Sequence, residues 1–179
     1  MDWKELRPNF NARGYLRDKH YTDEALEAVL QLDALILPGM PEEGGRLLSQ
    51  GSAAELFLSS ASDVRKLLER GGVRAALVQD PTLARREIVR KAADVFLPVI
   101  VLLQQGALPI ALGVLANWIW HRFGEPSGEN TEGDNILVEI VEMKTPDVCF
   151  RRLSFKGPAN RLVELLRAEA DRAIEQSER

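Results

Sequence analysis

The stretch Val95–Trp120, VFLPVIVLLQQGALPIALGVLANWIW, decides how the rest of the chain can fold. It contains no Asp, Glu, Lys or Arg, and it is longer than the roughly 20 apolar residues that cross a bilayer core. Pro98, Gly106 and Pro109 divide it into two pieces of a length more typical of buried core helices. We therefore expect a central, buried, apolar helical hairpin against which the other elements pack.

The same stretch leaves a second interpretation open, in which it inserts into a membrane. Cations precede it and acids follow it, and Trp118 and Trp120 lie where an interfacial aromatic belt would be. The residues expected to mark the segment, in a core or in a membrane, are Phe96, Leu103, Leu112, Trp118 and Trp120.

Composition excludes several classes of protein. The 179 residues are 45% hydrophobic and 28% charged, which is typical of a globular domain and not of a collagen-like or disordered chain. A formal net charge of -4 has the wrong sign for a dedicated nucleic-acid binder. Cys149 is the single cysteine, which indicates a reducing compartment, and with two histidines, His20 and His121, we expect no metal site.

Outward from the apolar stretch, the N-terminal part reads as mixed α/β. Thr22 is a plausible N-cap of a helix that must end before Pro38. Residues 54–78 read as strand, helix and strand, with parallel pairing of the two strands. Asp80 and Pro81 read as the start of another helix, over Leu83–Ala93, whose cations form a solvated face. The sequence near Met1 lacks the apolar core of a secretory signal.

The C-terminal part has clearer strand patterns. Residues 124–135 are rich in Gly, Ser, Glu and Asn and predict a flexible linker. Ile136–Met143 and Val148–Phe155 are rich in β-branched and aromatic residues, and the four residues between them suit a hairpin loop. A final helix follows Gly157 and Pro158, with an apolar stripe and charges elsewhere.

Few residues suggest chemistry. Ser59, Ser60 and Ser62 precede a helix, where hydroxyls and free N–H groups can hold a phosphate, although an ordinary helix cap is the simpler interpretation. There is no G-x-S-x-G elbow, and no catalytic triad can be assembled from the pattern. We interpret His121 as a residue that complements the C-terminal end of a helix dipole, and Cys149 as a half-buried structural thiol.

The predicted hairpin carries the best candidates for an interaction surface. Phe150 and Phe155 are interleaved with cations on its second strand, and the candidates are Arg151, Arg152, Phe155 and Lys156. Glu139 and Glu142 on the partner strand are placed to neutralise these cations by cross-strand pairing. An exposed edge of such a hairpin accepts strand addition from a partner.

The residues from about Ala93 onward resemble a pattern in uncharacterised bacterial proteins and in small effector-associated components of bacterial conflict systems. The resemblance rests on Ala93–Ile100, on Leu108–Trp120, and on the hairpin that ends at Phe155–Ala159. It implies a bacterial accessory or defence-related protein whose activity belongs to a partner, and it assigns no functional residue.

Together these patterns predict an α+β protein. Residues 1–123 form a mainly helical part with a strand-helix-strand unit and the apolar helical hairpin, 124–135 form a linker, and 136–179 form a β-hairpin plus helix around one shared core. We expect a non-catalytic cytoplasmic interaction protein without cofactor or metal, whose partner is another protein or a second copy. The alternatives are a membrane-associated effector that uses residues 95–120, at the inner membrane, and a phosphate or nucleotide binder that uses residues 59–63.

Overall fold

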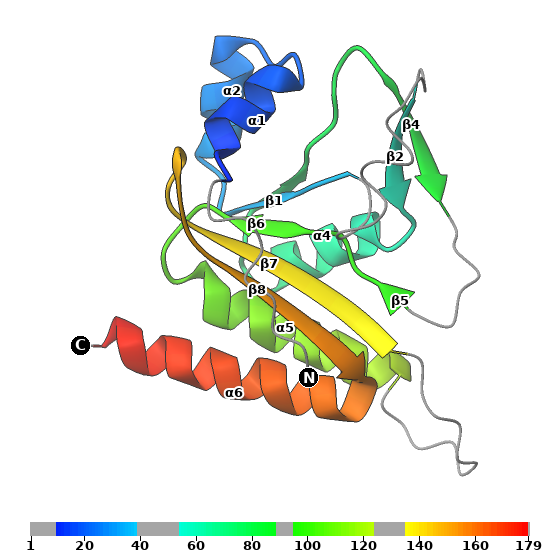
Figure 1. Cartoon of the computed structure of the whole chain (residues 1–179), viewed down its shortest axis with the longest axis vertical. Helices are drawn as coiled ribbons and strands as arrows, with labels where there is room; N and C mark the ends of the chain where they lie inside the picture. The colour runs from blue at the N-terminus through cyan, green and yellow to red at the C-terminus, as the bar shows by residue number, and fades with distance from the viewer. Residues whose placement is uncertain (1–9, 39–53, 89–94, 124–134, 179) are drawn as a thin grey trace.

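The computed structural model describes residues 10–38, 54–88, 95–123 and 135–178, and these form a mixed α/β fold (Figure 1). The helices are α1 (Ala12–Asp18), α2 (Asp23–Leu30), α4 (Ala61–Arg70), α5 (Ala107–Phe123) and α6 (Ala159–Ser177). The strands are β1 (Ala34–Ile36), β2 (Ala54–Leu58), β3 (Ala75–Leu77), β4 (Ala84–Ile88), β5 (Val95–Phe96), β6 (Ile100–Leu102), β7 (Asn135–Thr145) and β8 (Val148–Pro158).

A six-stranded mixed sheet runs through the middle of the fold. Its order is β3-β1-β6-β7, with β5 also paired to β7 and with β8 paired to β7 off this path. β1 is parallel to β3 and antiparallel to β6, β6 is parallel to β7, and β8 is antiparallel to β7. A separate two-stranded parallel sheet consists of β2 and β4. The sheet therefore joins segments from both ends of the sequence.

The first half of the apolar stretch is extended, so the predicted helical hairpin over Val95–Trp120 is wrong there. Val95 pairs with Ile136 and Ile100 pairs with Ile140, so one extra residue lies in the segment between β5 and β6. Pro98, which has no N–H to donate, lies at this irregularity. A strand buried on both faces reads as a continuous apolar run, which periodicity cannot distinguish from a buried helix.

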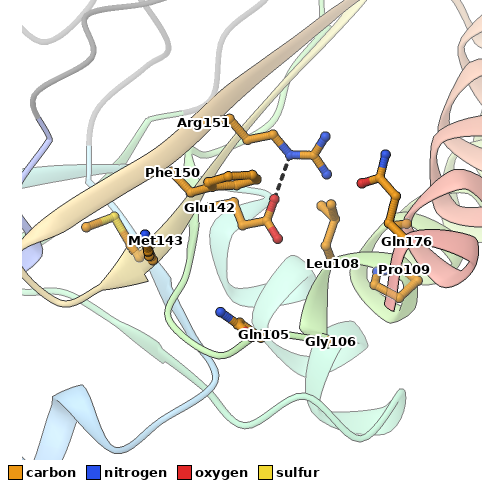
Figure 2. Close-up of a pocket in the computed structure, with 11 residues that line it drawn as sticks. Gln105, Gly106, Leu108, Pro109, Glu142, Met143, Phe150, Arg151 and Gln176 are labelled. Carbon is orange, nitrogen blue, oxygen red and sulfur yellow. Dashed lines mark hydrogen bonds and ion pairs between the residues drawn. The ribbon is translucent and has the colours of Figure 1, made fainter. Parts of the chain in front are cut away.

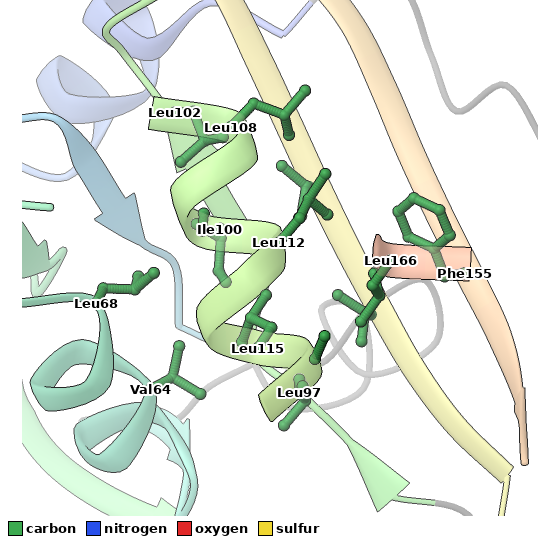
Figure 3. Packing of buried hydrophobic residues seen from close by; sticks show 14 of the residues in the cluster. Val64, Leu68, Leu97, Ile100, Leu102, Leu108, Leu112, Leu115, Phe155 and Leu166 are labelled. Carbon is green, nitrogen blue, oxygen red and sulfur yellow. The ribbon is translucent and has the colours of Figure 1, made fainter. Parts of the chain in front are cut away.

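The second half of the stretch forms α5, which is the centre of the larger core (Figure 3). Leu108, Leu112 and Leu115 are fully buried between the sheet, α4 and α6. Gly106 has a φ of +88° and turns the chain from β6 into α5, a conformation that other residues adopt at a cost. Of the residues expected to mark this segment, Leu103 and Leu112 are buried, Phe96 and Trp118 are half-buried, and Trp120 is exposed.

A second, smaller core covers the opposite face of the sheet. Side chains alternate along the strands, so Leu35 and Val101 point away from α5 and pack with Leu16 of α1 and Leu26 of α2. Thr22 caps α2 as expected, because its hydroxyl accepts a hydrogen bond from the amide of Ala25 at 3.3 Å. Helices therefore pack on both faces of the sheet (Figure 1).

One predicted helix is confirmed and another is replaced in part by a strand. The helix that Thr22 caps, α2, ends at Leu30 and so before Pro38 as expected, and Ala34–Ile36 forms β1. Ala84–Ile88 forms β4 where a helix was expected, and residues 89–93 of that prediction lie outside the described residues. The Asp80 carboxylate caps a turn instead of a helix, since it accepts hydrogen bonds from both the amide and the hydroxyl of Thr82.

The predicted unit over residues 54–78 has the expected elements but different pairing. β2, α4 and β3 follow one another, yet β2 pairs with β4 and β3 pairs with β1. The parallel pairing expected between β2 and β3 is therefore wrong, because each of them pairs with a different strand. Gly71 ends α4, and a Cβ built there would lie 2.5 Å from Cγ2 of Val114, so α4 and α5 approach closely at this point.

The C-terminal part adds β7, β8 and α6. β7 and β8 pair antiparallel from Asn135 opposite Pro158 to Thr145 opposite Val148, with register shifts near Met143. Residues 124–134 of the predicted linker lie outside the described residues. Within the described part of the chain, no helix has both the length and the apolar composition needed to cross a bilayer.

Candidate functional site

A pocket opens where the tip of the β7–β8 hairpin meets the start of α5 and the last turns of α6 (Figure 2). Its volume is about 250 Å³. The residues that line it are Gln105, Gly106, Leu108, Pro109, Glu142, Met143, Lys144, Phe150, Arg151, Ala173 and Gln176. Three segments that are distant in sequence therefore contribute to one concave surface.

Two carboxylates hold the Arg151 side chain in place at this pocket. It lies opposite Glu142 in the hairpin, and its Nε donates a hydrogen bond to a Glu142 carboxylate oxygen at 2.7 Å (Figure 2). Its Nη1 donates to Glu169 of α6 at 3.2 Å. The two carboxylates hold the guanidinium in one orientation and tie the hairpin to α6, as charge-assisted hydrogen bonds do.

Phe150 is the most exposed large hydrophobic residue in the described chain, with 62% of its surface accessible. Its ring lies beside the Arg151 guanidinium, with 5.6 Å between the guanidinium carbon and the ring centroid. Val148, 51% exposed, precedes it on the same strand. An exposed aromatic residue beside an oriented arginine is the combination enriched at the centres of protein interfaces.

Lys144 is a cation at the rim of the pocket. Glu142 is neutralised by Arg151, whereas Lys144 at the rim has no ion-pair partner within the described part of the chain. The first turn of α5, which begins at the pocket, contains no acidic residue, and helix N-termini carry a partial positive charge. A partner can therefore find an apolar contact at Phe150 and a cation at Lys144 on the same side of the molecule.

The hairpin residues predicted from sequence do not share one surface. Arg151 lines the pocket, but Arg152 and Lys156 point to the opposite face of the sheet, since side chains alternate along β8. Phe155 is buried in the larger core, so it does not lie on the interaction surface where it was expected. The cross-strand pairing expected of Glu142 is present, with Arg151 as its partner. Glu139 lies opposite Ser154, on the same face of the hairpin as Arg152 and Lys156.

The serine turn before α4 is held by an arginine. The hydroxyl of Ser62 accepts a hydrogen bond from Nη2 of Arg85 at 2.6 Å. Ser60 is the N-cap residue but makes no side-chain capping bond, and its hydroxyl is buried without a hydrogen-bond partner in the described structure. Ser59 is exposed. The turn thus brings a cation to the start of a helix, which the sequence pattern alone did not indicate.

His20 and Asp80 form a pair that the sequence patterns did not reveal. Nδ1 of His20 lies 2.8 Å from Oδ2 of the buried Asp80, and the rest of the imidazole is exposed. Hydrogen bonds from Thr82, followed by the bond with His20, lower the pKa of Asp80 to about 2. His20 also has a φ of 60° at the end of α1, a position more often occupied by glycine. The sequence Asp-Pro-Thr at 80–82 is typical of a turn capped by the Asp80 side chain, so it could have indicated the turn but not the contact with His20.

Other candidate chemistry is limited in the described residues. The Cys149 sulfur lies 3.8 Å from the carbonyl oxygen of Glu142, and burial raises the pKa of the thiol, which disfavours the thiolate. His121 lies in the last turn of α5, as expected for a residue at a helix end. Among the residues that the structure describes, no group of three or more His, Cys, Asp or Glu could hold a metal ion.

Comparison of the chain with protein-family models, with curated proteins and with solved structures finds no match.

Proposed function

We propose that this protein is a non-catalytic interaction protein that binds a partner protein at the hairpin pocket. The observation that carries the proposal is Phe150, which is 62% exposed beside a pocket of about 250 Å³. A cavity of this size is smaller than most drug-sized ligand sites and suits one or two side chains of a partner. The neighbouring Arg151 is already oriented, so a partner would lose little affinity to ordering it.

The setting we propose is a reducing, cytoplasmic compartment of a bacterium, in an accessory role within a defence or conflict system. The lone Cys149 supports a reducing compartment, and the resemblance of residues 93–179 supports the accessory role. No cofactor is needed for this function, because the pocket contributes shape and charge and not reactive groups.

A selection experiment tests the proposal with peptides in place of the partner. A random peptide library displayed on phage is panned against the full chain, and the selected peptides are measured against two variants. Phe150→Ala should weaken binding by at least roughly tenfold, as expected for a central interface residue. Trp120→Ala is the matched control, because it removes a 39% exposed aromatic residue at the other end of α5. Peptides that bind Phe150→Ala as tightly as the wild-type chain would contradict the proposal.

A second candidate function, phosphate binding at the start of α4, is supported by the hydrogen bond between Arg85 and Ser62. A helix N-terminus with a nearby arginine and hydroxyl groups is a favourable setting for an anion. Inorganic phosphate should then raise the melting temperature of the wild-type chain and not that of Ser62→Ala. Equal shifts in both proteins would exclude a site at this turn.

A further inference from the structure

We propose that the pocket at the hairpin tip is the contact surface of a two-fold symmetric dimer, in which Phe150 of each copy enters the pocket of the other. The inference rests on the proposed function, because it names the partner at that same site as a second copy of this chain. Two features of the pocket lead to it. An exposed aromatic side chain lies beside a cavity with apolar walls, and unpaired charges of opposite sign lie on opposite rims.

An apolar projection and an apolar cavity lie side by side on this surface (Figure 2). Phe150 is 62% exposed and lies at the edge of the cavity, whose volume is about 250 Å³. Leu108, Pro109 and Ala173 form apolar parts of the cavity wall. A projection next to a cavity is self-complementary, because a two-fold rotation places the projection of each copy over the cavity of the other.

The hairpin side of the pocket carries a cation without a counter-charge. Lys144 is exposed, and it forms no ion pair with any residue that the structure describes. The two acids nearest to it along the hairpin already have partners. Glu142 is paired with Arg151, and Asp147 lies 3.4 Å from Nε of Arg13. Lys144 is therefore available to a carboxylate from another molecule.

The α6 side of the pocket carries negative charge instead. The end of α6 contributes Gln176 to the cavity wall, and it also carries Glu175 and, at the C-cap, Glu178. Both glutamates are exposed, and neither forms an ion pair within the described ranges. The last turn of α6 contains no basic residue, although the C-terminal end of a helix carries a partial negative charge. A cation brought to this end of α6 would therefore be stabilised.

A two-fold axis through the mouth of the pocket brings these opposite charges together. The rotation exchanges the two rims, so the hairpin tip of one copy lies over the end of α6 of the other. Lys144 of each copy then faces the Glu175 and Glu178 carboxylates of the second copy, and the contact occurs at both rims. A second copy thus carries every complementary group in the matching order: the aromatic ring, the apolar cavity, the cation and the acids.

Sedimentation velocity of the full chain measures this association directly. A contact built on one pair of pockets is at the small end of interface sizes, so the dimer fraction should rise as the chain concentration increases from about 5 to about 500 µM. Phe150→Ala should weaken the dimer by at least roughly tenfold, because both copies lose the ring at the centre of the contact. Trp120→Ala removes a 39% exposed aromatic side chain at the other end of α5 and should leave the dissociation constant unchanged.

Charge reversal tests how the two copies are arranged. Lys144→Glu places like charges at both rims of the dimer, and so does the double variant Glu175→Lys with Glu178→Lys. Each of these proteins alone should dimerise at least roughly tenfold more weakly than the wild type. An equimolar mixture of the two should recover the wild-type affinity, because opposite charges then face each other at both rims. Lys66→Glu reverses an exposed cation on α4, away from the pocket, and is the control.

The outcomes separate this inference from the proposed function. A chain that stays monomeric at about 500 µM overturns the dimer, as does a dimer that Phe150→Ala leaves unchanged. A mixture of the two charge-reversal proteins that associates no better than either protein alone overturns the two-fold arrangement. If selected phage peptides still depend on Phe150 in these cases, the pocket binds a different protein and the proposed function stands. If they do not, the proposed function fails as well.

Discussion

Arg151 and Glu142 face each other across the β7–β8 hairpin, and Nε of Arg151 donates to the Glu142 carboxylate at 2.7 Å. The same guanidinium reaches Glu169 on α6 at 3.2 Å. One cation therefore connects the hairpin to the terminal helix and shapes the pocket between them. The neighbouring Phe150 remains exposed. Arg151 therefore shapes the pocket, and Phe150 is the residue that a partner can contact.

Arg151→Ala should lower the free energy of unfolding by about 1–3 kcal/mol, because it leaves two largely buried carboxylates without their cation. Urea denaturation at neutral pH measures the change. Arg172→Ala is the control, since that side chain is 72% exposed and pairs with Glu169 at 3.5 Å, and its loss should cost less than about 1 kcal/mol. Equal effects of the two variants would show that the network contributes no more than a surface pair.

Two glycines near the contact between α4 and α5 should respond to alanine with opposite signs. Gly71→Ala should destabilise the fold, because the new methyl group would lie 2.5 Å from Cγ2 of Val114. Val114→Ala in the same chain should recover much of that loss. Gly113→Ala lies inside α5 with open space around it and should stabilise the fold by about 0.5–1 kcal/mol. Thermal unfolding distinguishes these cases, and a stabilising Gly71→Ala would contradict the close approach.

Asp80 should make stability depend on acid pH. Its hydrogen bonds with Thr82 and His20 lower its pKa from 3.8 to about 2. A carboxylate whose pKa is lower in the folded state stabilises that state above the unfolded pKa, and the stabilisation is lost as the pH falls through the folded pKa. The stability difference between wild type and Asp80→Asn should therefore be largest above about pH 4 and decrease steadily as the pH falls towards about 2.

Urea denaturation at pH 7, 4 and 2.5 provides the comparison. Asp33, whose pKa is lowered by Arg74, titrates in the same acidic range in both proteins, so only the difference between wild type and Asp80→Asn reports on Asp80. A difference that is independent of pH would show that the Thr82 and His20 contacts do not depend on the charge of Asp80.

Cys149 should react slowly with alkylating reagents in the folded chain. Burial raises the pKa of its thiol, and the thiolate is the reactive form. Iodoacetamide at pH 8 should modify Cys149 more slowly in the native chain than in urea, as followed by mass spectrometry. Arg152→Gln should slow the reaction further, because the Arg152 charge favours the thiolate. A native rate equal to that in urea would contradict the effect of burial.

Several elements were predictable because their causes are local. Thr22 caps α2 through its own hydroxyl, and the segments at 136–143 and 148–155 lie within β7 and β8 as their β-branched and aromatic residues indicated. The mixed α/β character also followed from these patterns. The candidates on the hairpin were identified as residue types, but which of them share a surface depends on the alternation along β8 and on where α6 packs.

The error over the first half of the apolar stretch has a physical cause, which is burial of the strand on both faces. Ile100–Leu102 is fully buried, and such a run contains no alternation of polar and apolar residues that would distinguish a strand from a helix. The His20–Asp80 pair joins residues 60 positions apart, so no local pattern contains it. The pocket was likewise invisible, because it is assembled from the start of α5, the hairpin tip and the end of α6.

The sequence by itself determined a globular, mixed α/β chain with its apolar centre in residues 95–120, because composition and local capping do not depend on distant contacts. The tertiary structure decided that the first half of this centre is a strand, since β1 on one side and β7 on the other satisfy its backbone hydrogen bonds. It also decided that Arg151 builds a pocket, Phe155 fills the core and Arg152 faces the other side of the sheet. These outcomes depend on which segments pack together, and packing is set by the whole chain.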